Sequence, residues 1–160
     1  MHIFDLDLTL WETFDKRGNP IWAKQLIFPL SKIDVDVVCD DVGSKCVLRK
    51  GVRDYLSKLR RENCQIGYLS SGRHWDFDDH HQPSLHLLEL FEISRFFNDV
   101  KILSYKSRKK SDFLKYTDQK IIFYDDDESV IKDLSSLSHV FIVDAKSISD
   151  WSKIEGFKID

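Results

Sequence analysis

Five short apolar runs constrain the fold of this 160-residue chain more than any other feature of its sequence. They occupy residues 3–6, 65–69, 100–103, 120–124 and 139–143. Polar and apolar residues do not alternate within these runs, which is typical of parallel strands that are covered on both faces. Each gap between the runs contains a segment with apolar residues at helical spacing, and these segments are residues 52–61, 84–91, 111–116 and 129–137. A strand followed by a helix, repeated along the chain, predicts an α/β fold with a doubly wound, Rossmann-like parallel sheet.

A long insertion interrupts this repeat after the first run. It covers roughly residues 11–50, which is too long for an ordinary connection. Within it, residues 35–39 and 44–48 have the composition of two antiparallel strands, joined by a turn in which Gly43 supplies a positive φ. We therefore expect a short β-hairpin flap inserted after the first strand, and no large cap domain. Residues 1–160 are expected to form a single domain.

The composition excludes several classes of protein. The chain is 42% hydrophobic and 32% charged, with a formal net charge of -3, which is typical of a soluble globular protein. Its charge gives no strong evidence for binding to nucleic acid, and no apolar run approaches the ~20 residues that span a bilayer. The N-terminus lacks the pattern of a signal peptide. We expect a cytoplasmic protein without membrane contact, and the sequence gives no indication of its oligomeric state.

Three cysteines, Cys39, Cys46 and Cys64, match no zinc-binding template and cannot all pair within one molecule. Cys39 and Cys46 flank the expected turn, but the residues that face each other across it depend on the turn type. We interpret all three as reduced thiols.

Carboxylates follow two of the apolar runs. Asp5 and Asp7 are two residues apart, so in an extended segment their side chains would point the same way. Asp125 and Asp126 follow the run at residues 120–124. Carboxylates held together repel each other and need a cation or a proton, so a shared divalent ion is a natural solution. Ordinary turns and helix caps are the alternative explanation for each pair.

Other polar residues also occur where strands give way to loops or helices. Ser70 and Ser71 follow the run at residues 65–69, and Lys109 lies in a basic cluster before an expected helix. Each of these, taken alone, is more often a solvated loop. In an open α/β sheet, however, ligands bind beyond the carboxyl ends of the strands, where all of these residues would gather. The combination therefore indicates an active site.

These residues resemble the motifs of the haloacid dehalogenase superfamily of phosphohydrolases. The first motif of that superfamily is Asp-x-Asp-x-Thr, and residues 5–9 match it. Its second motif is a Ser or Thr after an apolar strand, as at Ser70, and its third is a Lys, as at Lys109. Its fourth is an acidic pair, as at residues 125–126.

The resemblance is closer to the magnesium-dependent phosphatases of this superfamily, which are sometimes grouped as acid phosphatases. Their first motif typically continues as Thr-Leu-Trp, as in residues 9–11, and their third resembles Lys-Lys-Ser-Asp-Phe at residues 109–113. Their fourth resembles Phe-Tyr-Asp-Asp-Asp at residues 123–127. These relatives often have an Arg directly after the serine of the second motif, where this chain has Ser71. Either Arg73 supplies that guanidinium from a shifted position or the substrate contact differs.

The resemblance implies a magnesium-dependent phosphatase that hydrolyses phosphate monoesters through an aspartyl-phosphate intermediate. Asp5 would be the nucleophile and Asp7 the general acid and base. Lys109 would neutralise Asp5 and the phosphate, while Ser70, with Ser71 and Arg73, would bind the substrate. The implied Mg²⁺ ligands are Asp5, Asp7 through its carbonyl, and Asp126, with support from Asp125. Oxygen ligands suit Mg²⁺ better than a soft metal, although they do not distinguish it from Mn²⁺.

The substrate remains open, because a phosphorylated small molecule and a phosphoprotein both fit a site without a large cap. Trp11, Phe14 and Trp22 either line its entrance or pack the flap. A cluster of His and Asp residues between 74 and 86 has the character of an ordinary hydrophilic stretch rather than a metal site.

Two other functions remain as alternatives. A receiver-like phosphate-binding or signalling module also places aspartates and a Lys around magnesium, but there the Lys follows the last strand, whereas Lys109 precedes the second acidic pair. A phosphotransferase or mutase of the same superfamily would usually need a cap that closes over the substrate.

Overall fold

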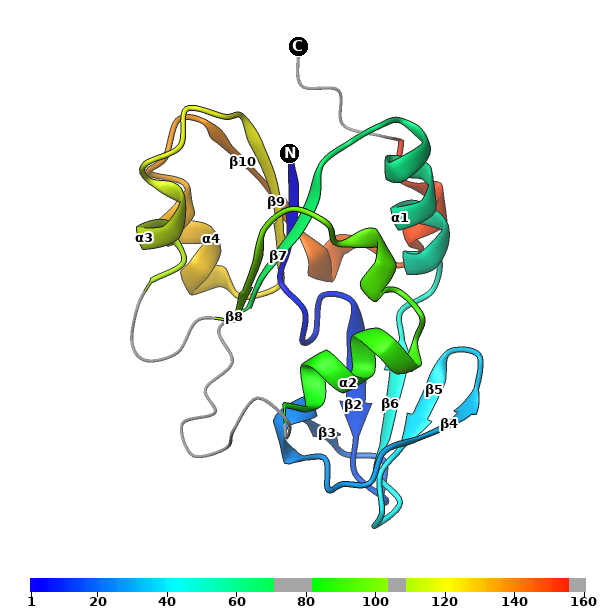
Figure 1. The fold of residues 1–160 in the computed structure, drawn as a ribbon. Coiled ribbons are helices and arrows are strands. Elements are labelled where there is room, and N and C mark those ends of the chain that lie inside the picture. The colour runs from blue at the N-terminus through cyan, green and yellow to red at the C-terminus, as the bar shows by residue number, and fades with distance from the viewer. Residues whose placement is uncertain (71–81, 104–108, 156–160) are drawn as a thin grey trace.

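The computed structural model describes residues 1–70, 82–103 and 109–155 and has an α/β fold with two separate five-stranded sheets (Figure 1). The first sheet is parallel throughout, with the strand order β10-β9-β1-β7-β8. Its strands, in chain order, are β1 (His2–Phe4), β7 (Ile66–Ser70), β8 (Lys101–Leu103), β9 (Ile121–Asp125) and β10 (Val140–Asp144). Each overlaps one of the five apolar runs, so the prediction of an α/β fold with a parallel sheet is confirmed.

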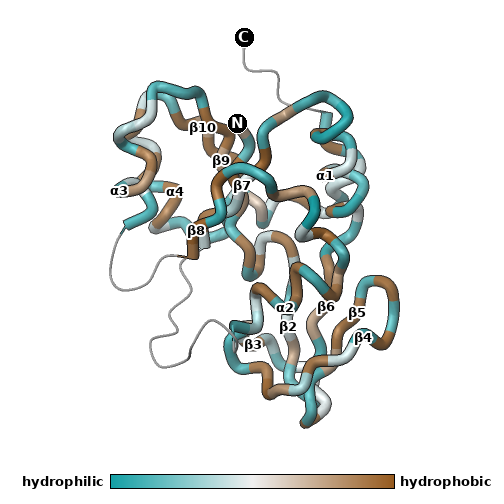
Figure 2. Tube along the Cα trace, viewed as in Figure 1, coloured by the Kyte–Doolittle hydropathy of each residue, from teal (hydrophilic) through white to brown (hydrophobic). Residues whose placement is uncertain are grey.

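Each predicted helical segment overlaps a helix. These helices are α1 (Val52–Arg61), α2 (Pro83–Leu90), α3 (Ser111–Leu114) and α4 (Glu128–Leu134). In Figure 2, β9 and β10 carry mainly hydrophobic residues, whereas much of α1 is hydrophilic, as expected of a helix that buries one stripe only. No helix among the described residues is both long and apolar enough to cross a membrane.

Both faces of the parallel sheet are covered. In β1, Phe4 belongs to an apolar cluster that includes Tyr55 and Leu56 of α1. Its neighbour Ile3 belongs to a second cluster, with Leu114 of α3 and Leu134 of α4. Successive side chains of a strand point to opposite faces, so the sheet separates the two clusters. This burial explains why the strands lack polar alternation in the sequence.

The second sheet is antiparallel and occupies most of the insertion between β1 and α1, with the order β3-β2-β6-β5-β4. Its strands are β2 (Trp11–Phe14), β3 (Pro20–Ile21), β4 (Ser31–Asp34), β5 (Val37–Cys39) and β6 (Lys45–Leu48), with the short 3-10 helix η1 (Ala23–Gln25) between β3 and β4. The predicted hairpin is present as β5 and β6, and Gly43 in its turn has φ +92°. The insertion is larger than the short hairpin expected from the sequence, because it forms a five-stranded sheet. Every residue of β4 is exposed, so an apolar pattern could not reveal this strand.

The cysteines agree with the expectation of reduced thiols, because all three are free. The hairpin register pairs Cys39 with Lys45 and Val38 with Cys46. Cys39 and Cys46 are therefore not opposite each other across the turn.

Candidate active site

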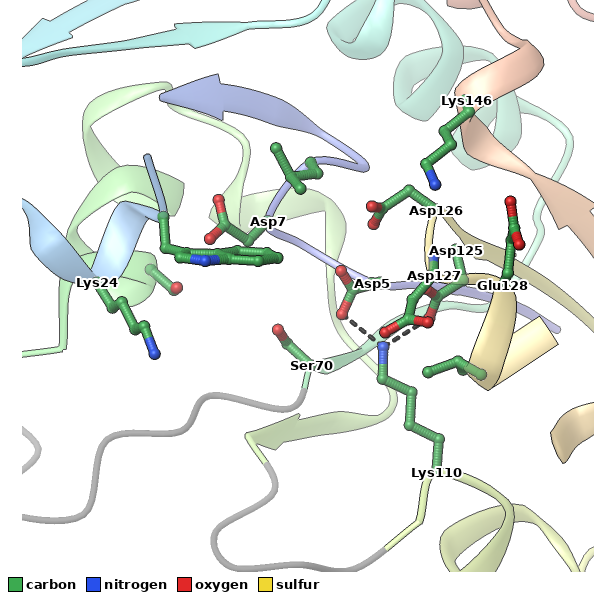
Figure 3. A pocket seen from close by; sticks show the side chains of 14 residues that line it. Asp5, Asp7, Lys24, Ser70, Lys110, Asp125, Asp126, Asp127, Glu128 and Lys146 are labelled. Atoms are coloured by element: carbon green, nitrogen blue, oxygen red, sulfur yellow. Dashed lines mark hydrogen bonds and ion pairs between the residues drawn. The ribbon is translucent and has the colours of Figure 1, made fainter. Parts of the chain in front are cut away.

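A cavity of about 650 Å³ lies at the carboxyl end of the parallel sheet, where β9, β1 and β7 are neighbours (Figure 3). Asp5 directly follows β1, Ser70 is the last residue of β7, and Asp125 is the last residue of β9. The adjacent strands therefore bring together residues that are far apart in the sequence. The predicted site residues that line the cavity are Asp5, Asp7, Ser70, Asp125 and Asp126.

Three carboxylates form the centre of the site. Asp5, Asp125 and Asp126 are all buried, and each offers an oxygen within 4.8 Å of the others. Loss of hydration raises the pKa of all three, and the neighbouring carboxylates raise it further. The pKa of Asp125 reaches about 6. The hydroxyl of Thr9 donates to Asp126 at 3.3 Å and so fixes one member of this carboxylate cluster.

Lys110 pairs with two of these carboxylates. Its Nζ lies 2.6 Å from Oδ1 of Asp5 and 2.6 Å from Oδ2 of Asp125, and its side chain is only 3% exposed. Burial alone would lower the pKa of Lys110, but the charges of Asp5 and Asp125 outweigh this effect and raise it. Lys110 is therefore a charged ammonium that links the ends of β1 and β9, as the dashed lines in Figure 3 show.

The structure corrects the lysine named from the sequence. Lys109 does not line the cavity, because its side chain is 74% exposed and its Nζ lies 3.7 Å from Oδ1 of Asp133. Lys110 immediately precedes α3, which begins at Ser111, and successive residues at the start of a helix point about 100° apart. Only one of two neighbouring lysines can then face the cavity. No feature of a Lys-Lys pair in the sequence indicates which one.

Asp7 occupies a different part of the cavity from the carboxylate cluster. Its Oδ1 accepts a hydrogen bond from Nε1 of Trp11 at 3.2 Å, and its Oδ2 accepts one from the backbone N–H of Ala23 at 3.0 Å. In Figure 3 its carboxylate points away from Asp5, toward the side where Lys24 lies. Burial raises the pKa of Asp7 to about 7, although the two donors partly oppose the shift. A carboxyl group with this pKa is present in both protonation states near neutral pH.

The second motif is described only in part. Ser70 is buried at the cavity wall, whereas Ser71 and Arg73 lie outside the described residues. Most of the cluster of His and Asp residues between 74 and 86 also lies outside them. His86 is described, and its ring packs edge-on against Phe28 with centroids 4.8 Å apart.

The insertion contributes more to the site than the sequence indicated. Trp22 and Lys24, at either side of Ala23, line the cavity, and the side chain of Trp22 remains half exposed. Trp11 is instead fully buried and contacts Asp7, and Phe14 is not among the lining residues. Lys146, which follows β10, lines the cavity as well. Trp22 is one of the aromatic residues that the sequence named for the entrance, whereas Lys24 and Lys146 lie in short polar segments whose sequence has no distinctive pattern.

Comparison with known proteins assigns the chain to a family. A family model described as Acid Phosphatase matches residues 1–150. A comparison with curated proteins gives no match. The family match confirms the resemblance to the magnesium-dependent acid phosphatases of the haloacid dehalogenase superfamily, and it confirms the prediction of a phosphoric monoester hydrolase. It therefore favours an enzyme over a phosphate-binding module without turnover.

Proposed function

This chain belongs to the acid phosphatase family, and on that premise we propose that it is a magnesium-dependent phosphatase that hydrolyses phosphate monoesters through an aspartyl-phosphate on Asp5. The observation that carries this proposal is the bridge from Lys110 to Asp5 and Asp125, at 2.6 Å on each side, beside a third buried carboxylate. A buried nucleophile, a fixed ammonium and a group of oxygen ligands at one cavity are what phosphoryl transfer requires of a protein.

The residues at the centre of the site fit a magnesium ion. Three carboxylates against one ammonium leave two negative charges within the cluster, which a divalent cation would balance. All the donor atoms are oxygens, as Mg²⁺ prefers. Asp5 and Asp126 would hold the ion, with support from Asp125 and, by resemblance to the family, from the main-chain carbonyl of Asp7. When bound, Mg²⁺ supplies positive charge against the phosphate oxygens and reduces their repulsion with Asp5.

In the first half of the reaction, a carboxylate oxygen of Asp5 attacks phosphorus as the bond from phosphorus to the ester oxygen breaks. Lys110 holds Asp5 in place and offsets its charge as the phosphate approaches. Asp7 gives its proton to the departing oxygen, so that an alcohol leaves rather than an alkoxide. Ser70, at the end of β7, would donate to a phosphate oxygen. Ser71 and Arg73 are proposed for the same role.

In the second half, water attacks the phosphorus of the aspartyl-phosphate. Asp7, which lost its proton in the first half, removes one from this water, and Asp5 is released as a carboxylate together with inorganic phosphate. The pKa of about 7 suits Asp7 to both tasks, because neither form is strongly disfavoured near neutral pH. Both oxygens of Asp7 accept hydrogen bonds from the insertion, so the second sheet acts as a flap that orients the acid.

The wall around Asp7 would receive the leaving group. Trp22 and Lys24 flank Ala23, whose N–H binds Asp7, so they lie where the alcohol departs. We propose a phosphorylated small molecule or a phosphoprotein as the substrate, since the cavity is walled on this side by the insertion rather than by a large cap.

The test is release of phosphate from p-nitrophenyl phosphate, with the Asp5→Asn variant as the blank. We expect turnover in the presence of Mg²⁺, and its loss when the metal is removed with a chelator and its return when Mg²⁺ is added back. A wild-type rate no higher than that of Asp5→Asn at saturating Mg²⁺ would contradict the proposed function.

Thr9 provides a test of the proposed metal ligands. Thr9→Val removes the hydroxyl that donates to Asp126 and keeps the shape of the side chain. Groups that orient a metal ligand in this way typically contribute a factor of about 10–100 to metal affinity. We therefore expect the Mg²⁺ concentration for half-maximal activity to rise by about tenfold. Thr13→Val, which removes a hydroxyl bonded to Cys46 in the second sheet, is the control. An unchanged Mg²⁺ requirement in Thr9→Val would argue against Asp126 as a ligand.

A further inference from the structure

Arg49 makes an unusual set of contacts directly after β6, where the chain leaves the second sheet. Its Nη1 donates to the carbonyl oxygens of Leu8 at 3.3 Å, Thr9 at 3.2 Å and Ala145 at 2.9 Å. Its Nη2 donates to the carbonyl oxygen of Ile148. Among the described residues, no ion pair joins Arg49 to a carboxylate. These hydrogen bonds of the guanidinium thus all go to backbone carbonyls.

The first two of these carbonyls belong to the loop that carries the proposed acid. Leu8 follows Asp7 directly, and Thr9 bonds Asp126. Leu8 has φ +63°, a left-handed conformation that is unfavourable for a residue with a side chain. Such a conformation persists only where the surroundings enforce it. The backbone N–H of Arg49 adds a bond to Leu10 at 2.9 Å, so this one residue holds three consecutive residues of the loop.

The other two carbonyls belong to the segment after β10. Ala145 begins the 3-10 helix η4 (Ala145–Ser147), which includes Lys146 at the cavity wall. The guanidinium also lies over the ring of Trp151, with its carbon 5.9 Å from the ring centroid. Its planar, forked donors allow one side chain to bind both segments at once, which a lysine could not do.

We infer that Arg49 is a positioning residue, which fixes the loop from Leu8 to Leu10 against η4 and thereby sets the position of Asp7 at the cavity. This inference rests on the proposed function, because it gives Arg49 its effect through the acid. A displacement of about 1 Å in a catalytic group can cost about 10²-fold in rate. Loss of Arg49 should therefore reduce the reactions that need a proton at the leaving oxygen more than those that do not.

The kinetic test compares two esters in the Arg49→Met variant. For glycerol 2-phosphate, whose alkoxide needs a proton, we expect kcat/KM to fall by about 10²-fold. For p-nitrophenyl phosphate, whose phenolate leaves without one, we expect a fall of less than about tenfold. Arg49→Lys should show the same selective loss to a smaller degree, since it keeps the charge and some of the donors. Equal losses for both esters in Arg49→Met would overturn the inference.

Arg53 supplies a matched control. Its guanidinium also binds backbone carbonyls, those of Val35 and Phe91, and pairs with Asp36 at 2.8 Å. None of these contacts reaches the loop after β1. Arg53→Met should therefore lose stability without any change in the ratio of kcat/KM for the two esters. A selective loss in Arg53→Met equal to that in Arg49→Met would show a general effect of lost stability and would also overturn the inference.

A second measurement does not depend on turnover. Amide hydrogen exchange, followed on peptides that cover residues 6–10 and 145–148, should become faster in Arg49→Met in both peptides and remain unchanged there in Arg53→Met. Unchanged exchange in these peptides of Arg49→Met would overturn the positioning role. Because no substrate is present, this result is distinct from a failure of the phosphatase assay with the wild-type protein, which would count against the proposed function itself.

Discussion

Replacing Lys110 with methionine should lower kcat/KM for p-nitrophenyl phosphate by about 10³-fold or more. Loss of one preorganised donor commonly costs about 10²–10³ in rate, and Lys110 is a charged donor that contacts two carboxylates at 2.6 Å. The variant also leaves Asp5 and Asp125 buried without their partner, a change that typically destabilises a protein by about 3–5 kcal/mol. Thermal unfolding, measured with Mg²⁺ present, would show how much of the activity loss comes from unfolding.

Lys109→Met is the matched control, because it removes the same charge one residue away. The side chain of Lys109 is 74% exposed, and an exposed ion pair such as that with Asp133 contributes about 0–1 kcal/mol. We expect its kcat/KM to stay within about twofold of the wild type. Lys110→Arg keeps the charge, so we expect it to be more stable than Lys110→Met but still less active than the wild type, because a guanidinium cannot place one nitrogen between Asp5 and Asp125 in the same way. Full activity in Lys110→Met, with the loss appearing in Lys109→Met instead, would refute this assignment.

The Asp7→Asn variant is expected to lose kcat/KM for glycerol 2-phosphate by about 10²–10⁴-fold, the range typical of general acid catalysis. For p-nitrophenyl phosphate the loss should be less than about tenfold, because p-nitrophenolate is a stable anion and needs no proton to leave. The ratio kcat/KM contains only the steps up to release of the alcohol, so the proposed role of Asp7 as a base in the second half does not affect the comparison. Equal losses for the two esters would contradict the acid role.

The Asp7→Asn substitution also changes the local hydrogen bonds. Both oxygens of Asp7 accept, from Trp11 and from Ala23, whereas an amide has only one acceptor. One donor therefore loses its partner, at a cost of about 1–3 kcal/mol. Trp11→Phe removes one of these donors and leaves Asp7 ionisable, so it is the control for this structural effect. It should lower stability with little change in the dependence of kcat/KM on the leaving group.

Much of the site could be predicted from the order of apolar runs and polar residues. Asp5, Ser70 and Asp125 each lie where a buried parallel strand ends, and the three strands are adjacent in the order β9-β1-β7. Because the ends of neighbouring parallel strands meet at one edge, their convergence follows from the α/β pattern alone. The helical spacing of apolar residues predicts α1 (Val52–Arg61) with its observed bounds, because those residues form one regular stripe that is buried.

The residues that the sequence missed are those whose orientation depends on nonlocal contacts. The choice between Lys109 and Lys110 is set by the start of α3 and by the two carboxylates that Lys110 meets. The burial of Trp11 agrees with packing of the flap, one of the two alternatives that the sequence leaves open, but the sequence does not indicate the hydrogen bond that Trp11 donates to Asp7. The contacts of Arg49 join segments up to 99 residues away, so no local pattern could indicate them.

The sequence by itself determined the α/β class, the assignment as a phosphatase and the strand ends at which the carboxylates gather. Alternation of strand and helix requires that the residues at strand ends gather at one edge, and paired aspartates require a cation or a proton wherever they lie together. Only the tertiary structure decided that Lys110 completes the carboxylate cluster, and that Asp7 faces the insertion rather than the other aspartates. The physical reason is that backbone patterns fix which segments meet, whereas the direction of an individual side chain depends on the partners that packing brings to it.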